Sequence, residues 1–99
     1  MDSKKSHEIA ANRISKKLKS EYNKDKGPDI VTPKLVVEVE TTNTVKDGLR
    51  QLQGFRKPVY IAGSNQEAVK KAIEATKDTT VGVMDSQGNI VKKSSRKKK

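Results

Sequence analysis

The chain has no cysteine and no tryptophan, and its only aromatic residues are two tyrosines and one phenylalanine. Without cysteine, a disulfide framework and a thiolate metal site are both excluded, which favours an intracellular protein. The scarcity of aromatic side chains predicts a small aliphatic core. No apolar run approaches the roughly 18 to 20 residues that a membrane-spanning helix requires, and the lysine-rich start has no apolar segment after it. We therefore expect a cytoplasmic protein with no membrane partner.

Lysine and arginine are in excess, and they give a net charge of +10 over 99 residues. Residues 1–26 hold eight Lys/Arg against four Asp/Glu, residues 27–91 hold eight against eight, and residues 92–99 hold six against none. Basic ends around a neutral middle suggest a polyanionic partner, most often nucleic acid, because each neutralised phosphate releases counterions. A solubilising tail, or the high lysine and glutamate content of heat-adapted proteins, is the alternative reading.

The first half of the chain predicts one helix and two strands. Apolar residues at helical spacing in residues 6–22 predict a helix capped by Ser6, with these side chains facing the core: Ile9, Ile14, Leu18 and Tyr22. The apolar runs DIV (29–31) and LVVEVET (35–41) are separated by turn residues and predict a hairpin-like pair of strands.

The second half predicts two more helices, a buried strand and a hairpin. Thr44 with Asp47, and Ser64 with Glu67, have capping-box spacing and would each open a helix. Between them KPVYIAGS (57–64) is apolar enough to be a strand buried on both sides. The inward positions of the two helices are Val45, Leu49, Leu52 and Phe55, then Ala68, Val69, Ala72, Ile73 and Thr76. TVGVMD and NIVKKS are expected to pair as the final hairpin.

Helices that alternate with strands require crossover connections, so this order predicts an α/β fold. We expect a mixed central sheet flanked by helices in a single domain over residues 1–94, followed by a disordered basic tail over residues 95–99. No internal repeat is present.

Three acids stand near each other if the two early strands pair. Glu38 and Glu40 share one face of the second strand because side chains alternate along a strand, and Asp29 begins the first strand. Like charges on one surface repel, so something must compensate them. Oxygen-rich clusters without cysteine suit hard divalent cations such as Mg²⁺, which keep several waters and bind through one or two carboxylates plus a phosphate.

The motif GPD-x8-E-V-E, from Gly27 to Glu40, resembles the PD-(D/E)XK nuclease superfamily, which has the restriction-endonuclease-like and Holliday-junction-resolvase-like fold. The resemblance covers residues 6–94. It implies a minimal α-β-β-β-α-β core and a metal-dependent hydrolysis of phosphodiester bonds. Asp29 and Glu38 would then be ligands of Mg²⁺ or Mn²⁺, with the carbonyl of Val39 as a further oxygen.

Glu40 occupies the position where the superfamily usually carries a lysine that positions or activates water. The resemblance implies that this glutamate acts as a base or an extra ligand, or else that the chain belongs with members that bind without catalysis. Glu8 matches a glutamate often found on the first helix, and Gln51 a glutamine often found on the helix after the motif strand. These residues complete the expected catalytic set.

Each residue also has an ordinary interpretation. Asp29 could end a turn or accept backbone hydrogen bonds, and the two glutamates could form the solvated face of an edge strand, paired with Lys34 or Arg50. Glu8 and Gln51 could be surface residues of their helices. His7 has no second histidine or cysteine as a partner, so an exposed side chain is expected.

The sequence therefore predicts a magnesium-dependent endonuclease for double-stranded or branched DNA, working as a homodimer without a small-molecule cofactor. The alternatives are a catalytically silent DNA-binding or assembly protein on the same fold, of the size and composition common in archaeal viruses and plasmids, and a protein–protein adaptor. The cations expected to contact phosphates lie in the first helix, around residues 50–57 and in the tail: Lys16, Lys17, Arg50, Arg56, Lys57, Lys92, Lys93, Arg96, Lys97, Lys98 and Lys99.

Overall fold

The structure is a computed structural model that describes residues 3–20, 22 and 28–96. Three helices and five strands follow one another in this order: α1 (Ser3–Lys17), β1 (Ile30–Val31), β2 (Val36–Glu40), α2 (Val45–Gln51), β3 (Val59–Gly63), α3 (Gln66–Ala75), β4 (Gly82–Met84) and β5 (Ile90–Lys92). The predicted α/β fold with a mixed sheet is confirmed. Among the residues described between α1 and α2 there are two strands, whereas the superfamily outline places three there.

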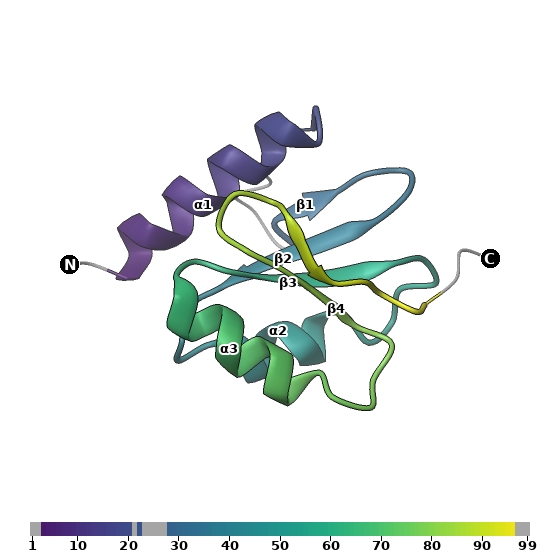
Figure 1. The fold of residues 1–99 in the computed structure, drawn as a ribbon. Helices are drawn as coiled ribbons and strands as arrows, with labels where there is room; N and C mark the ends of the chain where they lie inside the picture. The colour runs from purple at the N-terminus through teal and green to yellow at the C-terminus, as the bar shows by residue number, and fades with distance from the viewer. Residues whose placement is uncertain (1–2, 21, 23–27, 97–99) are drawn as a thin grey trace.

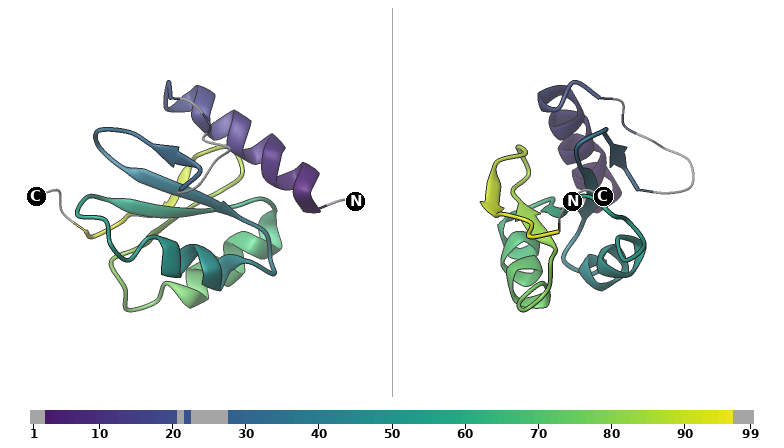
Figure 2. Two further views of the ribbon diagram at one scale, coloured as in Figure 1. Left: turned by 180° about the vertical axis from the view of Figure 1, so that it is seen from behind. Right: turned by 90° about the vertical axis from the view of Figure 1, so that its right-hand side faces the viewer.

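The five strands form one sheet in the order in which they occur in the chain. β1 and β2 are antiparallel, β2, β3 and β4 are parallel, and β4 and β5 are antiparallel. Each parallel pair is joined by one crossover helix, α2 or α3. Both crossover helices cover one face of the sheet and α1 covers the other (Figures 1 and 2). This layering confirms that helices flank both faces.

Each face of the sheet has its own aliphatic core because side chains alternate along the strands. Under α1 the core includes Ile14, Val37 and Val39, and under α2 and α3 it includes Val36 and Ile61. All five residues of β2 and all five of β3 are buried. Burial of both central strands confirms the prediction of a strand covered on both sides.

The helix starts differ from those predicted. α1 begins at Ser3, so Ser6 is inside the helix, and it ends at Lys17, before Tyr22. Thr44 is the residue before α2, but its side chain makes no capping bond to the helix. Instead its Oγ1 accepts the Thr41 N–H at 2.9 Å, which closes the turn that leads into α2.

The cap of α3 is one residue later than predicted. Asn65, and not Ser64, precedes the helix, and its side chain accepts the Ala68 N–H at 2.8 Å. Asparagine accepts a hydrogen bond from a first-turn amide as well as serine does. The residue types alone therefore could not show whether Ser64 or Asn65 caps the helix. Two side chains predicted to face inward are exposed instead: Ile9 at 43% and Ile73 at 38%.

No described helix is both long and apolar enough to span a membrane.

The C-terminal segment was expected to be a disordered tail from residue 95. Ser95 and Arg96 are hydrogen-bonded to the body of the protein, through Thr80 and through the carbonyls of Leu52 and Phe55. The described part of the segment expected to be a tail is therefore attached. Residues 97–99 lie outside the described residues.

Candidate acidic site at the end of strand β2

A depression of about 340 Å³ lies where β2 ends and α2 begins. It is bordered by one residue of α1, the last two of β2, the connecting turn and two residues of α2, namely His7, Val39, Glu40, Thr41, Thr44, Asp47 and Gln51. The crossover connection places this turn at the carboxyl end of a parallel strand, where α/β proteins commonly bind ligands. The acids singled out in the sequence lie in and beside this depression.

Asp29 comes immediately before β1 and is buried, with 8% of its surface exposed. Ile30 pairs with Val37, so Asp29 lies beside Glu38 across the two strands. Its Oδ2 accepts two hydrogen bonds, from the Val39 N–H at 2.8 Å and from His7 Nε2 at 3.0 Å. The interpretation of Asp29 as an acceptor of backbone hydrogen bonds is confirmed, and the side chain is also held in place beside the acids.

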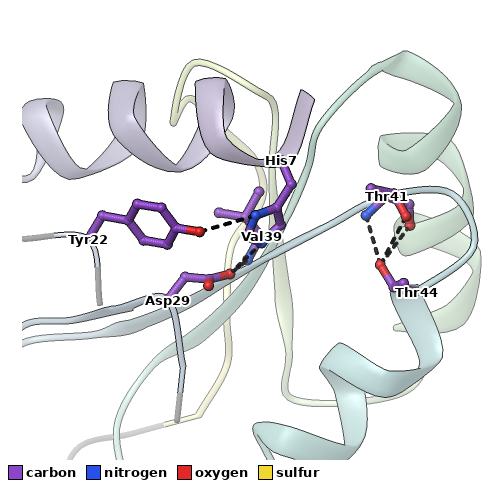
Figure 3. Close-up of polar contacts among 6 residues, drawn as sticks. All are labelled: His7, Tyr22, Asp29, Val39, Thr41 and Thr44. Carbon is purple, nitrogen blue, oxygen red and sulfur yellow. Dashed lines mark hydrogen bonds and ion pairs between the residues drawn. The ribbon is translucent and has the colours of Figure 1, made fainter. Parts of the chain in front are cut away.

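His7 was expected to be exposed, and this was wrong. Its side chain is 25% exposed and lies between Asp29 and the Tyr22 hydroxyl, whose oxygen is 3.3 Å from His7 Nδ1 (Figure 3). The hydrogen bond with Asp29 raises the pKa of His7 above its usual value; burial opposes the rise, and the charges of Asp29 and Glu40 add to it. The sequence prediction considered only a second histidine or cysteine as a partner for His7. It could not find the pairing with Asp29, because this partner is a carboxylate 22 positions away.

Glu38 is the most unusual residue of the site. It is 4% exposed, and its Oε2 is buried without a hydrogen-bond partner. The pKa of Glu38 is raised to about 9, mainly by burial. The hydrogen bond with Asp29 and the negative charges of Asp29 and Glu40 contribute to this rise. The alternative of a solvated edge-strand face is wrong, because β2 lies between β1 and β3 and both its faces are covered.

Glu40, at the end of the same strand, is 5% exposed and lines the depression. Burial raises the pKa of Glu40 to about 7, and the charge of Asp29 acts in the same direction. A hydrogen bond with Thr44 and the charge of His7 act against this rise. The side chain packs against α2 at Gly48, where a Cβ would stand 2.7 Å from Glu40 Cγ. A glycine at this position is therefore what lets the helix approach the glutamate so closely.

The donor set fits a hard cation held by few protein ligands. Within the described residues, no group of three or more histidine, aspartate or glutamate side chains is arranged to hold a metal ion. Asp29 and Glu38 are neighbours, however, and the unpartnered oxygen of Glu38 is the kind of buried atom that a cation would satisfy. Mg²⁺ typically uses one or two carboxylates and fills its remaining positions with water and phosphate.

The two single-residue matches differ in position. Gln51, the last residue of α2, is exposed and borders the depression, so it is near the acids. Glu8 follows His7 on α1 and is exposed; it is close enough to Tyr22 for its charge to contribute to the raised pKa of that hydroxyl, after burial and the charge of Asp29. It does not border the depression.

Several of the predicted phosphate-binding cations are hydrogen-bonded within the protein. Lys57 Nζ donates to the Thr32 carbonyl at 2.9 Å, Lys92 Nζ to the Thr76 carbonyl at 2.6 Å, and Arg96 Nη1 to the Leu52 carbonyl at 2.6 Å. Lys17 donates to Asn89, and Arg50 pairs with Asp47 and not with either glutamate. The exposed remainder of the described set is Lys16, Arg56 and Lys93.

The basic C-terminal segment and the acids lie at opposite ends of the sheet. Ser94 Oγ accepts the N–H of Val59, the first residue of β3, whereas Glu40 pairs with Gly63, the last residue of that strand. The described cations of this segment, Lys92, Lys93 and Arg96, therefore do not surround the acidic depression.

Comparison of the chain with protein-family models, with curated proteins and with solved structures finds no match.

Proposed function

We propose that the protein is a metal-dependent endonuclease of the PD-(D/E)XK type that hydrolyses phosphodiester bonds in double-stranded or branched DNA. The observation that carries this proposal is the buried, unpartnered Glu38 oxygen beside Asp29 and Glu40. Burying a carboxyl oxygen without a partner costs free energy that an apolar residue at this position of the strand would avoid. A divalent cation would remove this cost.

In the proposed site Asp29 and Glu38 hold the cation, and the Val39 carbonyl is the third protein oxygen. When bound, Mg²⁺ would stabilise the charge that builds on the phosphodiester and would lower the pKa of a bound water. The Glu40 carboxylate, which lines the depression, would accept the proton of the attacking water. Gln51 borders the same depression and can donate a hydrogen bond to the phosphate.

The element order supports the superfamily assignment in part. An antiparallel pair that carries the acids, followed by a helix and a parallel strand, agrees with the motif region of the superfamily outline. The chain departs from the outline in having two strands, and not three, in the part described before α2, and in the added α3, β4 and β5. The proposed function therefore depends on the site and not on the architecture alone.

DNA is the proposed substrate because the chain carries a net charge of +10. The protein measures 39 × 28 × 23 Å, and a DNA-binding module usually buries about 1,000 Å² or more. A homodimer would supply a larger contact surface and a second site. Of the described cations predicted to contact phosphates, Lys16, Arg56 and Lys93 are exposed, whereas the others are hydrogen-bonded within the protein.

The test is a cleavage assay with supercoiled plasmid and with branched DNA, in Mg²⁺, in Mn²⁺ and in EDTA. We expect nicking that requires the metal and falls at least about 100-fold in Asp29→Asn, which keeps the size of the side chain but removes its charge. Glu74→Gln is the matched control, because it removes one exposed carboxylate from α3, away from the acids.

Three results would contradict the proposal. Nicking that persists in EDTA or in Asp29→Asn would show that the acids are not the active site. Salt-dependent DNA binding without nicking in either metal would favour the catalytically silent DNA-binding protein. Absence of any DNA affinity at low salt would favour the adaptor.

A further inference from the structure

Three side chains form a continuous hydrogen-bonded row beside the acidic depression. The Tyr22 hydroxyl is 3.3 Å from His7 Nδ1, and His7 Nε2 is 3.0 Å from Asp29 Oδ2. Figure 3 shows the row ending at the backbone of Val39, whose N–H reaches the same Asp29 oxygen. The row thus connects α1 and the residue Tyr22 beyond it to the proposed metal ligands.

When His7 is neutral, the row favours one of its two tautomers. A neutral histidine has one donor nitrogen and one acceptor nitrogen. A carboxylate oxygen accepts hydrogen bonds, so in this row His7 Nε2 is the donor to Asp29 Oδ2. In the neutral imidazole Nδ1 is then the acceptor and the Tyr22 hydroxyl is its donor, which favours the tautomer with hydrogen on Nε2.

Both donors to Asp29 use the same oxygen. The Val39 N–H and His7 Nε2 each bond to Oδ2, so neither of these donors occupies Oδ1, and Glu38 is the neighbour with which a cation would share this carboxyl group. A carboxylate with two hydrogen bonds on one oxygen is restricted in rotation about its last bond. Partners of this kind orient a ligating group, and their loss typically costs about 10- to 100-fold in metal affinity.

We propose that His7 and Tyr22 are positioning residues that hold Asp29 with one oxygen directed to the cation, and that Tyr22 acts through the tautomer of His7. The inference rests on the proposed metal site. It assigns a role to the only histidine of the chain and to one of its two tyrosines, neither of which is part of the PD-x8-E-V-E pattern.

The experiment uses the full-length chain and measures the affinity for Mn²⁺ by the electron paramagnetic resonance of the free ion. We expect about a 10- to 100-fold weaker Kd in His7→Ala and a smaller loss in Tyr22→Phe. His7→Gln retains an N–H donor of similar reach and should recover most of the affinity. Tyr60→Phe, which removes the hydroxyl of the other tyrosine, is the matched control.

A second measurement needs no metal. Nitrogen-15 spectra of the imidazole, taken at a pH where His7 is neutral, report its tautomer directly. We expect hydrogen on Nε2 in the wild type and a mixture of tautomers in Tyr22→Phe. Because Tyr22→Phe deletes one partly buried hydroxyl, it also provides a test in case His7→Ala does not fold.

The outcomes separate this inference from the proposed function. Wild-type protein that binds Mn²⁺ with a Kd unchanged in His7→Ala would overturn the positioning role alone. Hydrogen on Nδ1 in the wild type would do the same, since His7 could not then donate to Asp29. Wild-type protein that does not bind Mn²⁺ would overturn both proposals.

Discussion

The two ends of the central sheet differ in whether their buried polar groups have hydrogen-bond partners. Where β2 ends, Glu38 and Glu40 are buried with raised pKa values, and one oxygen of Glu38 has no partner. Where β3 begins, Ser94 Oγ accepts the Val59 N–H and donates to the Thr80 carbonyl at 2.7 Å. The acidic end therefore contains buried carboxyl groups that destabilise the fold, whereas the buried polar groups at the other end are hydrogen-bonded.

The difference separates polar residues that stabilise the fold from acids whose burial is unfavourable and which the proposed function would explain. At the satisfied end, Lys92 and Arg96 donate to carbonyls just beyond α3 and α2, as cations near helix C-termini commonly do. Their charges were predicted to bind phosphates, but their described contacts hold the fold. At the acidic end, the carboxyl groups weaken the fold and require another reason for their presence.

The largest effect is expected from Glu38→Gln in the metal-free protein. Glu38 keeps its proton in the folded state up to a pKa of about 9, whereas the unfolded chain loses it near 4.5, so stability falls as the pH rises between these values. At pH 8 the glutamine variant should be more stable by roughly 2–4 kcal/mol, since each unit of pKa shift corresponds to about 1.4 kcal/mol.

Urea unfolding in EDTA at pH 5 and pH 8 measures this effect. The wild type should lose stability between the two pH values, and Glu38→Gln should lose much less. Equal pH dependence in the two proteins would show that Glu38 is not buried as a protonated acid, and the contrast between the two ends would fail.

A second, opposite effect is expected at the satisfied end. Ser94→Ala removes the partner of the Val59 N–H and one of the two donors to the Thr80 carbonyl, which keeps the Ser95 N–H. It should cost about 2 kcal/mol because the buried Val59 N–H is left unpaired. Ser95→Ala is the control, since that side chain is exposed. A cost no larger than that of the control would show that the hydroxyl is dispensable and would weaken the comparison.

A smaller loss is expected from Thr76→Val, about 1 kcal/mol. The Thr76 hydroxyl is buried, donates to the Ala72 carbonyl at 2.8 Å and lies 3.2 Å from Lys92 Nζ. Valine has the same shape but no hydroxyl. Thermal unfolding measures the change, and a variant as stable as the wild type would show that the Lys92 contact with the Thr76 carbonyl suffices by itself.

The smallest effect concerns the contact between Gly48 and Glu40. Alanine in place of glycine in a helix normally stabilises it by about 1 kcal/mol, but here the new methyl group would displace the Glu40 side chain. We expect Gly48→Ala to be nearly neutral by itself and to stabilise the protein by about 1 kcal/mol in a Glu40→Ala background. A double-mutant cycle in urea measures this coupling, and additive effects would show that helix and glutamate are not in close contact.

The elements of the fold could be predicted from the sequence because their patterns are local. The alternation of Val37 and Val39 with the glutamates, and the turn residues before Leu35, were enough to predict two paired strands. The end of α1 was harder to predict, because Leu18 and Tyr22 continue the helical apolar spacing after the helix ends at Lys17. Both pack against the α1-side core from outside the helix.

The site could be predicted only in part. The shared face of Glu38 and Glu40 and their proximity to Asp29 follow from strand periodicity and pairing. Their burial does not, because it depends on β3 and α2 covering β2. The partnership of His7 with Asp29 depends on how α1 packs across the sheet, and no local pattern encodes that placement.

The most direct test of the account is the location of a bound metal. Nitrogen-15 spectra of the full chain, recorded with small amounts of Mn²⁺, show which amides the paramagnetic ion broadens. The account predicts that Asp29, Glu38, Val39 and Glu40 broaden first and that Asp29→Asn abolishes this selectivity. Broadening centred on other acids, such as Asp78 or Asp85, or unchanged broadening in Asp29→Asn, would contradict it.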